Sequence, residues 1–426
     1  MFTESEDEEQ IIERVAALDI GKAELVCCVR MPAPPGKKRR LQEVTTHTTM
    51  VGSLSELANR LVGLGVQRVV MEATSDYWRA PFYLFAAHGL DPWLVNAKDV
   101  HHLPGRPKTY RLDAVWLCKV AERQMLRPSF VPEAGIRRLR DLTRYRVDLV
   151  GVRTAEKNRV EKLLEDACIK LSVVASDIFG VSGREMLDAI IAGERDPKVL
   201  AEKARSRLRL KMAELEEAFA GLQLGTFDDH HRFLLTRMLA RIDQTDRDIA
   251  ALDEQIEAHL VPFADAVARL DEIPGIGPRA AAAIVAEIGT DMTQFPTPDH
   301  LASWARFTPG IKSSAGKTKG NGSTGHGNRY LARAICEAAI ATRHTQTFLG
   351  VRYRRLVRRR GKKKAMVAVG RSILTVIWHL LNDPDIPFRE LGPQHYDTHV
   401  STKARQRSHI KGLEALGYKV ILQPAA

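Results

Sequence analysis

The chain has 426 residues, of which 44% are hydrophobic and 27% charged, an ordinary composition for a globular protein of about two to four domains. Its formal net charge of +12 favours a polyanionic partner. Residues 1–10 are acidic and polar, which excludes a secretory signal peptide. Because no uninterrupted apolar run is long enough to span a bilayer, we expect no membrane partner.

The five cysteines contain no Cys-x-x-Cys pair, and their number is odd. We therefore expect free, buried thiols in a reducing cytoplasm rather than a disulfide framework. They are Cys27, Cys28, Cys118, Cys168 and Cys336.

Residues 12–130 alternate between strand-like and helix-like runs, which predicts an α/β domain. Residues 15–20 and 25–30 are expected to pair as a hairpin around Gly21-Lys22. The further predicted elements are helices at 54–64 and 78–88, strands at 68–71 and 93–96, and a helix carrying Asp113 after a Pro/Gly break at 104–107.

Three acids in this domain occupy positions that suit a metal site. Asp19 and Glu72 each end an apolar strand-like run, and Asp113 begins an apolar helical stretch. Acids at strand ends are costly to bury unless they are paired or bound to a metal, and an oxygen-only site suits Mg²⁺ or Mn²⁺. Such ions can stabilise both the attacking and the leaving oxygen of a phosphoryl displacement. A fourth acid would be expected one helical turn before Asp113, where the chain has Tyr110.

From Pro132 the pattern becomes helical for more than a hundred residues, and one stretch contains a heptad seam with a single polar member. A seam this regular favours a coiled-coil dimer over a helix packed inside a monomeric bundle. Its members are Leu235, Met238, Ile242, Thr245, Ile249, Leu252 and Ile256.

A Gly/Pro-rich turn at 273–278 precedes a helical run at 279–288 and resembles a helix-hairpin-helix turn. In such turns Gly275 and Gly277 would let backbone N–H groups approach a phosphate. A tight connection without a ligand explains this segment equally well.

A glycine-rich loop follows, which includes residues 312–317 and carries Lys317, Lys319, His326 and Arg329. A serine hydroxyl in a cationic loop can act as a nucleophile if its proton is removed and the developing charge is neutralised. From these residues alone, a loop that contacts phosphate without covalent chemistry is the preferred interpretation.

Residues 352–364 contain nine Lys or Arg and no acid, a pattern typical of a phosphate-backbone footprint. The residues that we expect to contact nucleic acid here are Arg354, Arg355, Arg358, Arg359, Lys362 and Lys363.

Taken together, these segments resemble the IS110 family of bacterial insertion-sequence transposases, also called DEDD transposases. The resemblance covers nearly the whole chain. Its N-terminal markers are Leu-Asp19-Ile-Gly-Lys, Met-Glu72-Ala-Thr and Pro-Gly-Arg-Pro-Lys108-Thr-Tyr110-Arg-Leu-Asp113-Ala. Its C-terminal markers are Pro274-Gly-Ile-Gly-Pro, Thr308-Pro-Gly, Ser314-Ala-Gly-Lys and Gly325-His-Gly-Asn328.

The resemblance implies an architecture of three domains flanked by an acidic N-terminus and a basic tail. The acidic N-terminus would be residues 1–11, followed by a RuvC-like (RNase H-like) domain at 12–131. A helical, coiled-coil dimerisation region would occupy 132–262, a C-terminal transposase domain 263–390 and the tail 391–426.

The resemblance also implies the chemistry. Asp19, Glu72 and Asp113 match three of the four metal-site acids, and Ser314 matches a serine that forms a covalent link to DNA, with Ser313 as its immediate neighbour. Lys108, Lys317, Lys319 and Arg329 would contact nucleic acid. Tyr110 departs from the family pattern, which has an Asp there.

By the same resemblance, the protein would be a bacterial cytoplasmic, nucleoid-associated DNA recombinase. It would act on donor and target DNA under the guidance of a structured non-coding RNA, as a homodimer or homotetramer whose active sites combine two subunits. Two alternatives stay open. One is a RuvC-like nuclease that hydrolyses DNA through metal-bound water, and the other is a catalytically impaired nucleic-acid-binding relic.

Overall fold

The computed structural model describes residues 11–34, 39–72, 75–96, 110–310, 312–314, 317–319, 322–395 and 402–422. The chain divides into two compact units, residues 1–131 and 132–426. The first is a mixed α/β unit and the second is almost wholly helical.

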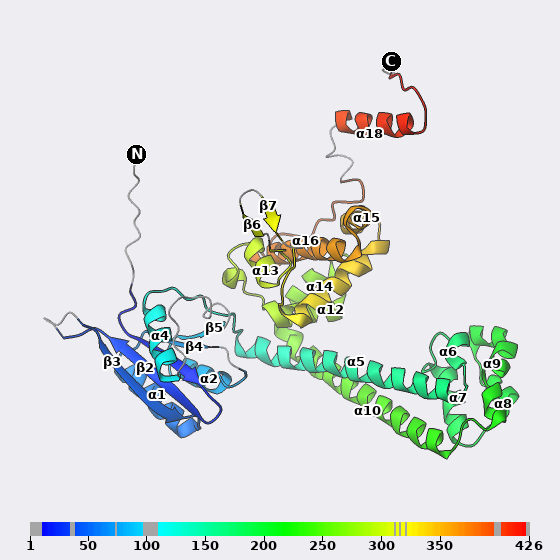
Figure 1. Ribbon diagram of the computed structural model, residues 1–426, viewed down its shortest axis with the longest axis horizontal. Coiled ribbons are helices and arrows are strands. Elements are labelled where there is room, and N and C mark those ends of the chain that lie inside the picture. The colour runs from blue at the N-terminus through cyan, green and yellow to red at the C-terminus, as the bar shows by residue number, and fades with distance from the viewer. Residues whose placement is uncertain are drawn as a thin grey trace. The chain divides into compact units, whose positions relative to one another are not determined.

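The N-terminal unit is built on a five-stranded sheet in the order β3-β2-β1-β4-β5 (Figure 1). β1 pairs antiparallel with β2, and β2 with β3, whereas β1–β4 and β4–β5 are parallel. The strands are β1 (Val15–Ile20), β2 (Glu24–Met31), β3 (Leu41–Thr48), β4 (Arg68–Glu72) and β5 (Pro92–Val95). Four of them were predicted from the sequence, and β3 was missed.

Helices cover both faces of this sheet. Alternate residues of β1 and β4 contribute to two separate cores, as the two-residue period of a strand requires. One core includes residues of α1 (Val51–Gly63) and Phe85 of α2 (Arg79–Ala87). The other includes Ala114, Leu117 and Cys118 of α4 (Tyr110–Glu122). The predicted helices are therefore confirmed.

The C-terminal unit contains two long helices, α5 (Ala134–Asp166) and α10 (Asp229–Leu260), which lie side by side (Figure 1). The two helices are antiparallel, because residues later in α5 pair with residues earlier in α10. Arg146 pairs with Asp253, Arg153 with Asp246, and Asp166 accepts from His231. We call this pair of helices the arm.

The heptad seam of α10 is largely buried within its own chain. Five of its seven members are buried along the helix that packs on α5, and Thr245 donates its hydroxyl to the Arg241 carbonyl at 2.7 Å. Within this chain the seam therefore packs on α5, and the coiled-coil dimer stays a prediction.

One end of the arm carries a small helical lobe, residues 167–228, which we call the arm-tip lobe (Figure 1). Its core joins the ends of both long helices to residues such as Met186, Leu200 and Phe219. Its elements are α6 (Leu171–Val174), α7 (Val181–Ile191), α8 (Pro197–Ala201), η1 (Ser206–Lys211), α9 (Met212–Ala218) and η2 (Ala220–Leu224).

The remaining elements are helices, most of which pack together as a bundle, and one short hairpin. They are η3 (Val261–Phe263), α11 (Ala264–Asp271), α12 (Pro278–Ile288), η4 (Met292–Gln294), α13 (Pro298–Trp304), β6 (Lys312–Ser314), β7 (Lys317–Lys319), α14 (Arg329–Ala341), η5 (Thr342–His344), α15 (Phe348–Arg360), α16 (Lys362–Asn382) and α18 (Thr402–Ala415).

Among the described residues, α16 alone is long and apolar enough to cross a membrane by length and composition, which the sequence reading had not anticipated. The apolar sequence of this continuous helix contains Arg371, which pairs with Asp299 at 2.7 Å. Ile373, Leu374 and Ile377 are fully buried in the bundle. These contacts fit a core helix.

All five cysteines are free, but their environments differ. Cys27, Cys28 and Cys118 are buried as expected, Cys336 is half-buried, and Cys168 is exposed, which corrects the expectation for that residue. Burial raises the pKa of the Cys27 thiol to about 12, with a further contribution from neighbouring Cys28.

Because the thiolate is the reactive form, alkylation of the native protein at mildly alkaline pH is expected to modify Cys168 long before Cys27. Peptide mass spectrometry over a time course of iodoacetamide treatment measures both rates. Unfolded protein is the control, in which the two rates should converge. Equal rates in the native protein would contradict the burial of Cys27.

Candidate active site and nucleic-acid interface

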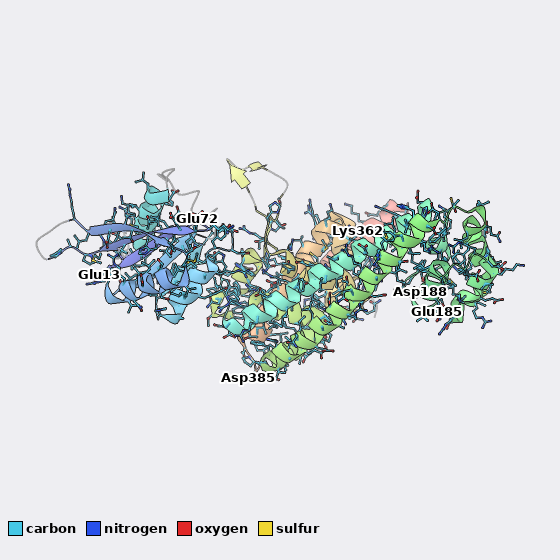
Figure 2. All side chains as sticks on the ribbon, turned by 90° about the horizontal axis from the view of Figure 1, so that it is seen from below. Glu13, Glu72, Glu185, Asp188, Lys362 and Asp385 are labelled. Atoms are coloured by element: carbon cyan, nitrogen blue, oxygen red, sulfur yellow. The ribbon has the colours of Figure 1, made fainter. Side chains whose placement is uncertain are left out.

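Asp19 and Glu72 occupy neighbouring positions at the carboxyl ends of two parallel strands. The register of β1 and β4 sets Leu18 beside Met71, so the next residues along are Asp19 and Glu72. Adjacent strands lie about 4.8 Å apart. Ala17 and Val70 belong to the core beneath α4, and two-residue alternation places both acids on that same face. Figure 2 shows Glu72 at the opposite end of the sheet from Glu13.

Asp113 lies in the first turn of α4, the helix that packs on this face. The direction of α4 follows from its far end, where the Ile12 amide donates to the Glu122 carbonyl at 3.0 Å just before β1 begins. Buried Glu122 is also paired with Arg30 at 2.6 Å and Arg40 at 3.1 Å. The start of α4 therefore lies toward the end of β1 that carries Asp19.

The three acids are all half-buried at the same end of the sheet. Within the described ranges, however, no three His, Cys, Asp or Glu side chains are close enough together to hold a metal ion. Tyr110 is the first residue of α4, one turn before Asp113. Lys108 lies outside the described residues.

The serine-bearing segment forms a short antiparallel hairpin. Lys312 is paired with Lys319, Ser313 with Thr318, and Ser314 with Lys317. Ser314 is therefore the last residue of β6, directly opposite a lysine across the hairpin, whereas Ser313 is opposite a threonine. The sequence had indicated only an irregular glycine-rich loop here.

The base of this serine loop, residues 310–328, is fixed to the helical bundle. The Gly310 amide donates to the Ser323 carbonyl at 3.1 Å, which closes the loop. At its exit, Asn328 caps α14 by accepting from the Tyr330 and Leu331 amides at 3.0 and 3.2 Å. A Cβ on Gly327 would lie 2.7 Å from Arg306 Cγ, so the loop exit lies too close to Arg306 for a larger residue.

A buried carboxylate that sequence reasoning missed anchors this exit. Glu287, on α12, is 1% exposed and accepts two hydrogen bonds from Arg144 of α5, at 2.7 and 2.8 Å. It also accepts from the Asn328 side-chain amide at 2.5 Å. Arg140 donates to the carbonyl oxygens of Ala286 and Glu287 at 2.9 and 2.8 Å. One carboxylate thus joins α5, α12 and the end of the serine loop.

The charges in this network support one another. Burial opposes the charge of Arg144, but its hydrogen bonds and attraction to Glu287 outweigh that effect and raise the pKa of the guanidinium. Arg144 also lies over the Tyr330 ring, 4.9 Å from its centroid. The Tyr330 hydroxyl in turn donates to Asp148 of α5 at 3.0 Å. Arg329 is exposed, within 3.4 Å of the same carboxylate.

The helix-hairpin-helix-like turn joins α11 to α12. Gly275 has a φ of +92°, and a Cβ there would lie 2.4 Å from the Ala338 carbonyl oxygen, so packing against α14 already requires glycine. Gly277 lies in open space just before α12. Both glycines line a cavity of about 710 Å³ together with Arg144, Arg279 and Arg333.

The basic run forms the end of α15 and the start of α16, which are separated by Gly361 at a φ of +77°. Lys362, labelled in Figure 2, begins α16. Arg354 donates to the carbonyls of Arg343 and Thr345 at 2.9 and 2.8 Å, so it has an internal structural role. The remaining predicted contacts are exposed: Arg355, Arg358, Arg359, Lys362 and Lys363.

Two profiles of known protein families match this chain. Residues 16–169 match the profile of the IS110-type DEDD transposases, and residues 267–353 match that of the transposase IS116/IS110/IS902 family. The second match contains the serine hairpin, the Gly275 turn and Glu287.

Two curated relatives agree with these matches. The chain is 27% identical over 314 residues to the insertion element IS110 uncharacterized 43.6 kDa protein of Streptomyces coelicolor, covering 68% of this chain and 75% of the relative. It is 25% identical over 335 residues to the transposase for insertion sequence element IS1111A of Coxiella burnetii, covering 77% and 81%. These similarities define a DNA transposase. The chain belongs to the IS110 family of transposases.

Proposed function

We propose that this transposase exchanges DNA strands through a covalent link between Ser314 and DNA, assisted by a divalent metal ion at Asp19, Glu72 and Asp113. The observation that carries the serine assignment is the register of the hairpin, which sets Ser314 opposite Lys317. Residues directly opposite in an antiparallel pair have Cβ atoms about 4.5–5.5 Å apart. Ser313 is paired with Thr318 instead, so the register favours Ser314.

The sheet supports an RNase H-like (RuvC-like) fold for the N-terminal unit. Its order is β3-β2-β1-β4-β5 with only β2 antiparallel to its neighbours, and this brings Asp19 and Glu72 together on adjacent parallel strands. Three carboxylates are a donor set that suits a hard cation such as Mg²⁺ or Mn²⁺. Because the described side chains are not grouped closely enough to hold an ion in this structure, binding would have to draw the three acids together, with DNA oxygens and water completing the ligands. When bound, the ion would stabilise negative charge on the phosphate.

In the proposed reaction the Ser314 hydroxyl loses its proton and its Oγ attacks a DNA phosphorus. An Oγ–P bond forms while one ester P–O bond breaks, and the departing DNA oxygen takes up a proton. The energy of the phosphodiester is conserved in the new ester, so a DNA hydroxyl can later displace the serine without a nucleotide cofactor. Lys317 would stabilise the developing negative charge.

We further propose that a structured non-coding RNA selects the donor and target DNA, and that the protein works as a dimer or tetramer. Base pairing would then carry sequence specificity, leaving the protein to recognise backbone charge and shape. The net charge of +12, the low aromatic content of 6% and the exposed cations around Gly361 support a protein that recognises the nucleic-acid backbone while base pairing selects the sequence. The family resemblance is the source of the RNA hypothesis.

The test is a strand-cleavage assay with donor DNA, Mg²⁺ and the RNA transcribed beside the gene, analysed on a denaturing gel. The expected product is a protein–DNA adduct that forms only when the RNA is present. Free DNA ends without an adduct would instead support the hydrolytic nuclease. Inactivity under all conditions would support the relic.

Tyr110 provides a separate prediction about the metal site. Tyr110→Asp would place a carboxylate on the same helical face as Asp113. We expect the Mg²⁺ concentration for half-maximal adduct formation to fall by at least about ten-fold. Residues that only hydrogen-bond to metal ligands already change metal affinity by about this factor. Tyr110→Phe is the matched control, because it removes the hydroxyl without adding an acid. An unchanged Mg²⁺ dependence in Tyr110→Asp would remove this position from the metal site.

A further inference from the structure

A strongly basic segment lies in the arm-tip lobe, far along the chain from the serine loop and the α15–α16 cations. Residues 203–211 contain five Lys or Arg and no acid. The five are Lys203, Arg205, Arg207, Arg209 and Lys211. Figure 1 places this lobe, with α8 and α9, at the end of α5 and α10.

The local structure directs two of the three apolar residues of this segment inward and leaves Leu210 exposed beside the cations. Ala204 is buried and Leu208 packs against the core of the lobe, while Arg207 and Arg209 between and beyond them are exposed. The short helix η1 is followed directly by α9, so the segment is held at both ends by folded structure. The exposed cations are therefore presented by a defined surface.

The segment forms one side of a surface cleft of about 560 Å³. Arg205, Arg207 and Lys211 line it from one side, and Ser182 at the start of α7 lines it from the other. The Arg205 amide donates to Ser182 Oγ at 3.0 Å, which joins the two sides. Asp177 is the single acid among the residues that line this cleft.

The charges of this surface are only partly neutralised. Arg205 is paired with Glu185. Lys211 donates to the Val174 carbonyl at 3.2 Å and is paired with Glu214 at 3.9 Å. Neither Arg207 nor Arg209 is in an ion pair within the described part of the chain. Several exposed cations along one segment offer more than one phosphate contact, which favours a polynucleotide over a single small anion.

We propose that residues 203–211 of the arm-tip lobe bind the phosphodiester backbone of the polynucleotide on which the enzyme acts, as a second contact remote from the serine loop. Arg144 of α5 contacts Glu287 at the base of that loop, and α5 continues from there to Asp166, about 33 Å at 1.5 Å per residue. That reach corresponds to about 10 base pairs of duplex at 3.4 Å each. The arm thus holds nucleic acid at two separated points. This surface acts in binding alone and does not depend on the serine chemistry.

Equilibrium binding of the full-length protein tests the proposal with three labelled probes: a hairpin-closed duplex DNA of about 6 base pairs, too short to span the arm, a duplex DNA of about 30 base pairs and a single-stranded RNA of about 30 nucleotides. The test variant is Arg207→Glu/Arg209→Glu. The charge-matched control is Arg241→Glu/Arg247→Glu, which changes two exposed arginines of α10.

The tip variant is expected to bind at least one of the long probes about ten-fold more weakly and to lower the slope of log K against log salt by about one to two. The short duplex and the control variant should be nearly unaffected. The long probe that loses affinity identifies the contact as DNA or RNA. The milder Arg207→Gln/Arg209→Gln variant should show a smaller loss in the same direction.

An equal loss in the control would overturn the proposal, because total charge would then explain the effect. Unchanged affinity for both long probes, or an equal loss on the short duplex, would overturn it as well. Light scattering of the same samples adds one further outcome. Altered self-association with unchanged nucleic-acid binding would make this surface a contact between protein copies and dismiss the proposal.

Discussion

Ser314→Ala is expected to abolish the covalent protein–DNA adduct while leaving DNA binding nearly unchanged. Removal of a catalytic nucleophile lowers the rate by at least about a thousand-fold, because the bond-forming atom itself is lost. The substitution deletes one hydroxyl from a hairpin end and leaves the cations of the loop in place. Adduct formation is measured on a denaturing gel, and binding by filter retention with the same DNA.

Ser313→Ala is the matched control for this experiment. It removes the same group one residue earlier, from the position opposite Thr318 instead of Lys317. We expect it to retain adduct formation within about ten-fold of the unmodified protein, as for a change beside rather than at a nucleophile. If the two variants exchanged phenotypes, Ser313 would be the nucleophile. If both formed the adduct normally, serine catalysis from this hairpin would be refuted.

Much of the N-terminal fold could be predicted because its strands are buried on both faces. Val15 to Leu18 and Val69 to Met71 are fully buried, and such runs are recognisable by apolar content alone. β3 could not be predicted because it is an edge strand that is exposed or half-buried along its length, so its sequence, rich in threonine, lacks an apolar period. The positions of Asp19 and Glu72 at strand ends followed from the recognisable strands.

The heptad seam of α10 illustrates a different limit. The pattern correctly predicts that Leu235, Ile242 and Ile249 are buried, but a pattern on one helix does not identify its partner. The partner is α5, whose sequence is rich in Arg, Asp and Glu and which forms ion pairs with α10. Leu239, outside the predicted seam, is buried because the arm-tip lobe packs there.

Glu287 was missed for a related reason. A lone glutamate in an alanine-rich helix is usually solvent-exposed, and its arginine partners are more than 140 residues earlier in the chain. One signal was available in the sequence. Residues 281–288 are otherwise entirely apolar, which indicates a helix buried on all sides and therefore an acid that requires a partner.

Glu287→Ala is expected to destabilise the C-terminal unit by about 3–5 kcal/mol, because it leaves Arg144 and the Asn328 amide without their buried acceptor. For a unit of this size that corresponds to a fall of roughly 10 °C in its melting temperature. Thermal unfolding followed by tryptophan fluorescence measures the change, since Trp304 and Trp378 lie in this unit. Below the melting temperature, adduct formation should also fall, because Asn328 ends the serine loop.

The matched control is Glu337→Ala on α14, whose exposed pair with Arg333 at 2.8 Å should contribute only about 0–1 kcal/mol. If the two variants melted at the same temperature, Glu287 would not anchor the loop. A double-mutant cycle isolates the pair itself, because Arg144→Ala should cost much less when Glu287 has already been removed. Independent, additive effects would instead indicate that each residue stabilises the bundle by packing. Coupled stability effects together with the loss of adduct would link the buried carboxylate to the placement of Ser314.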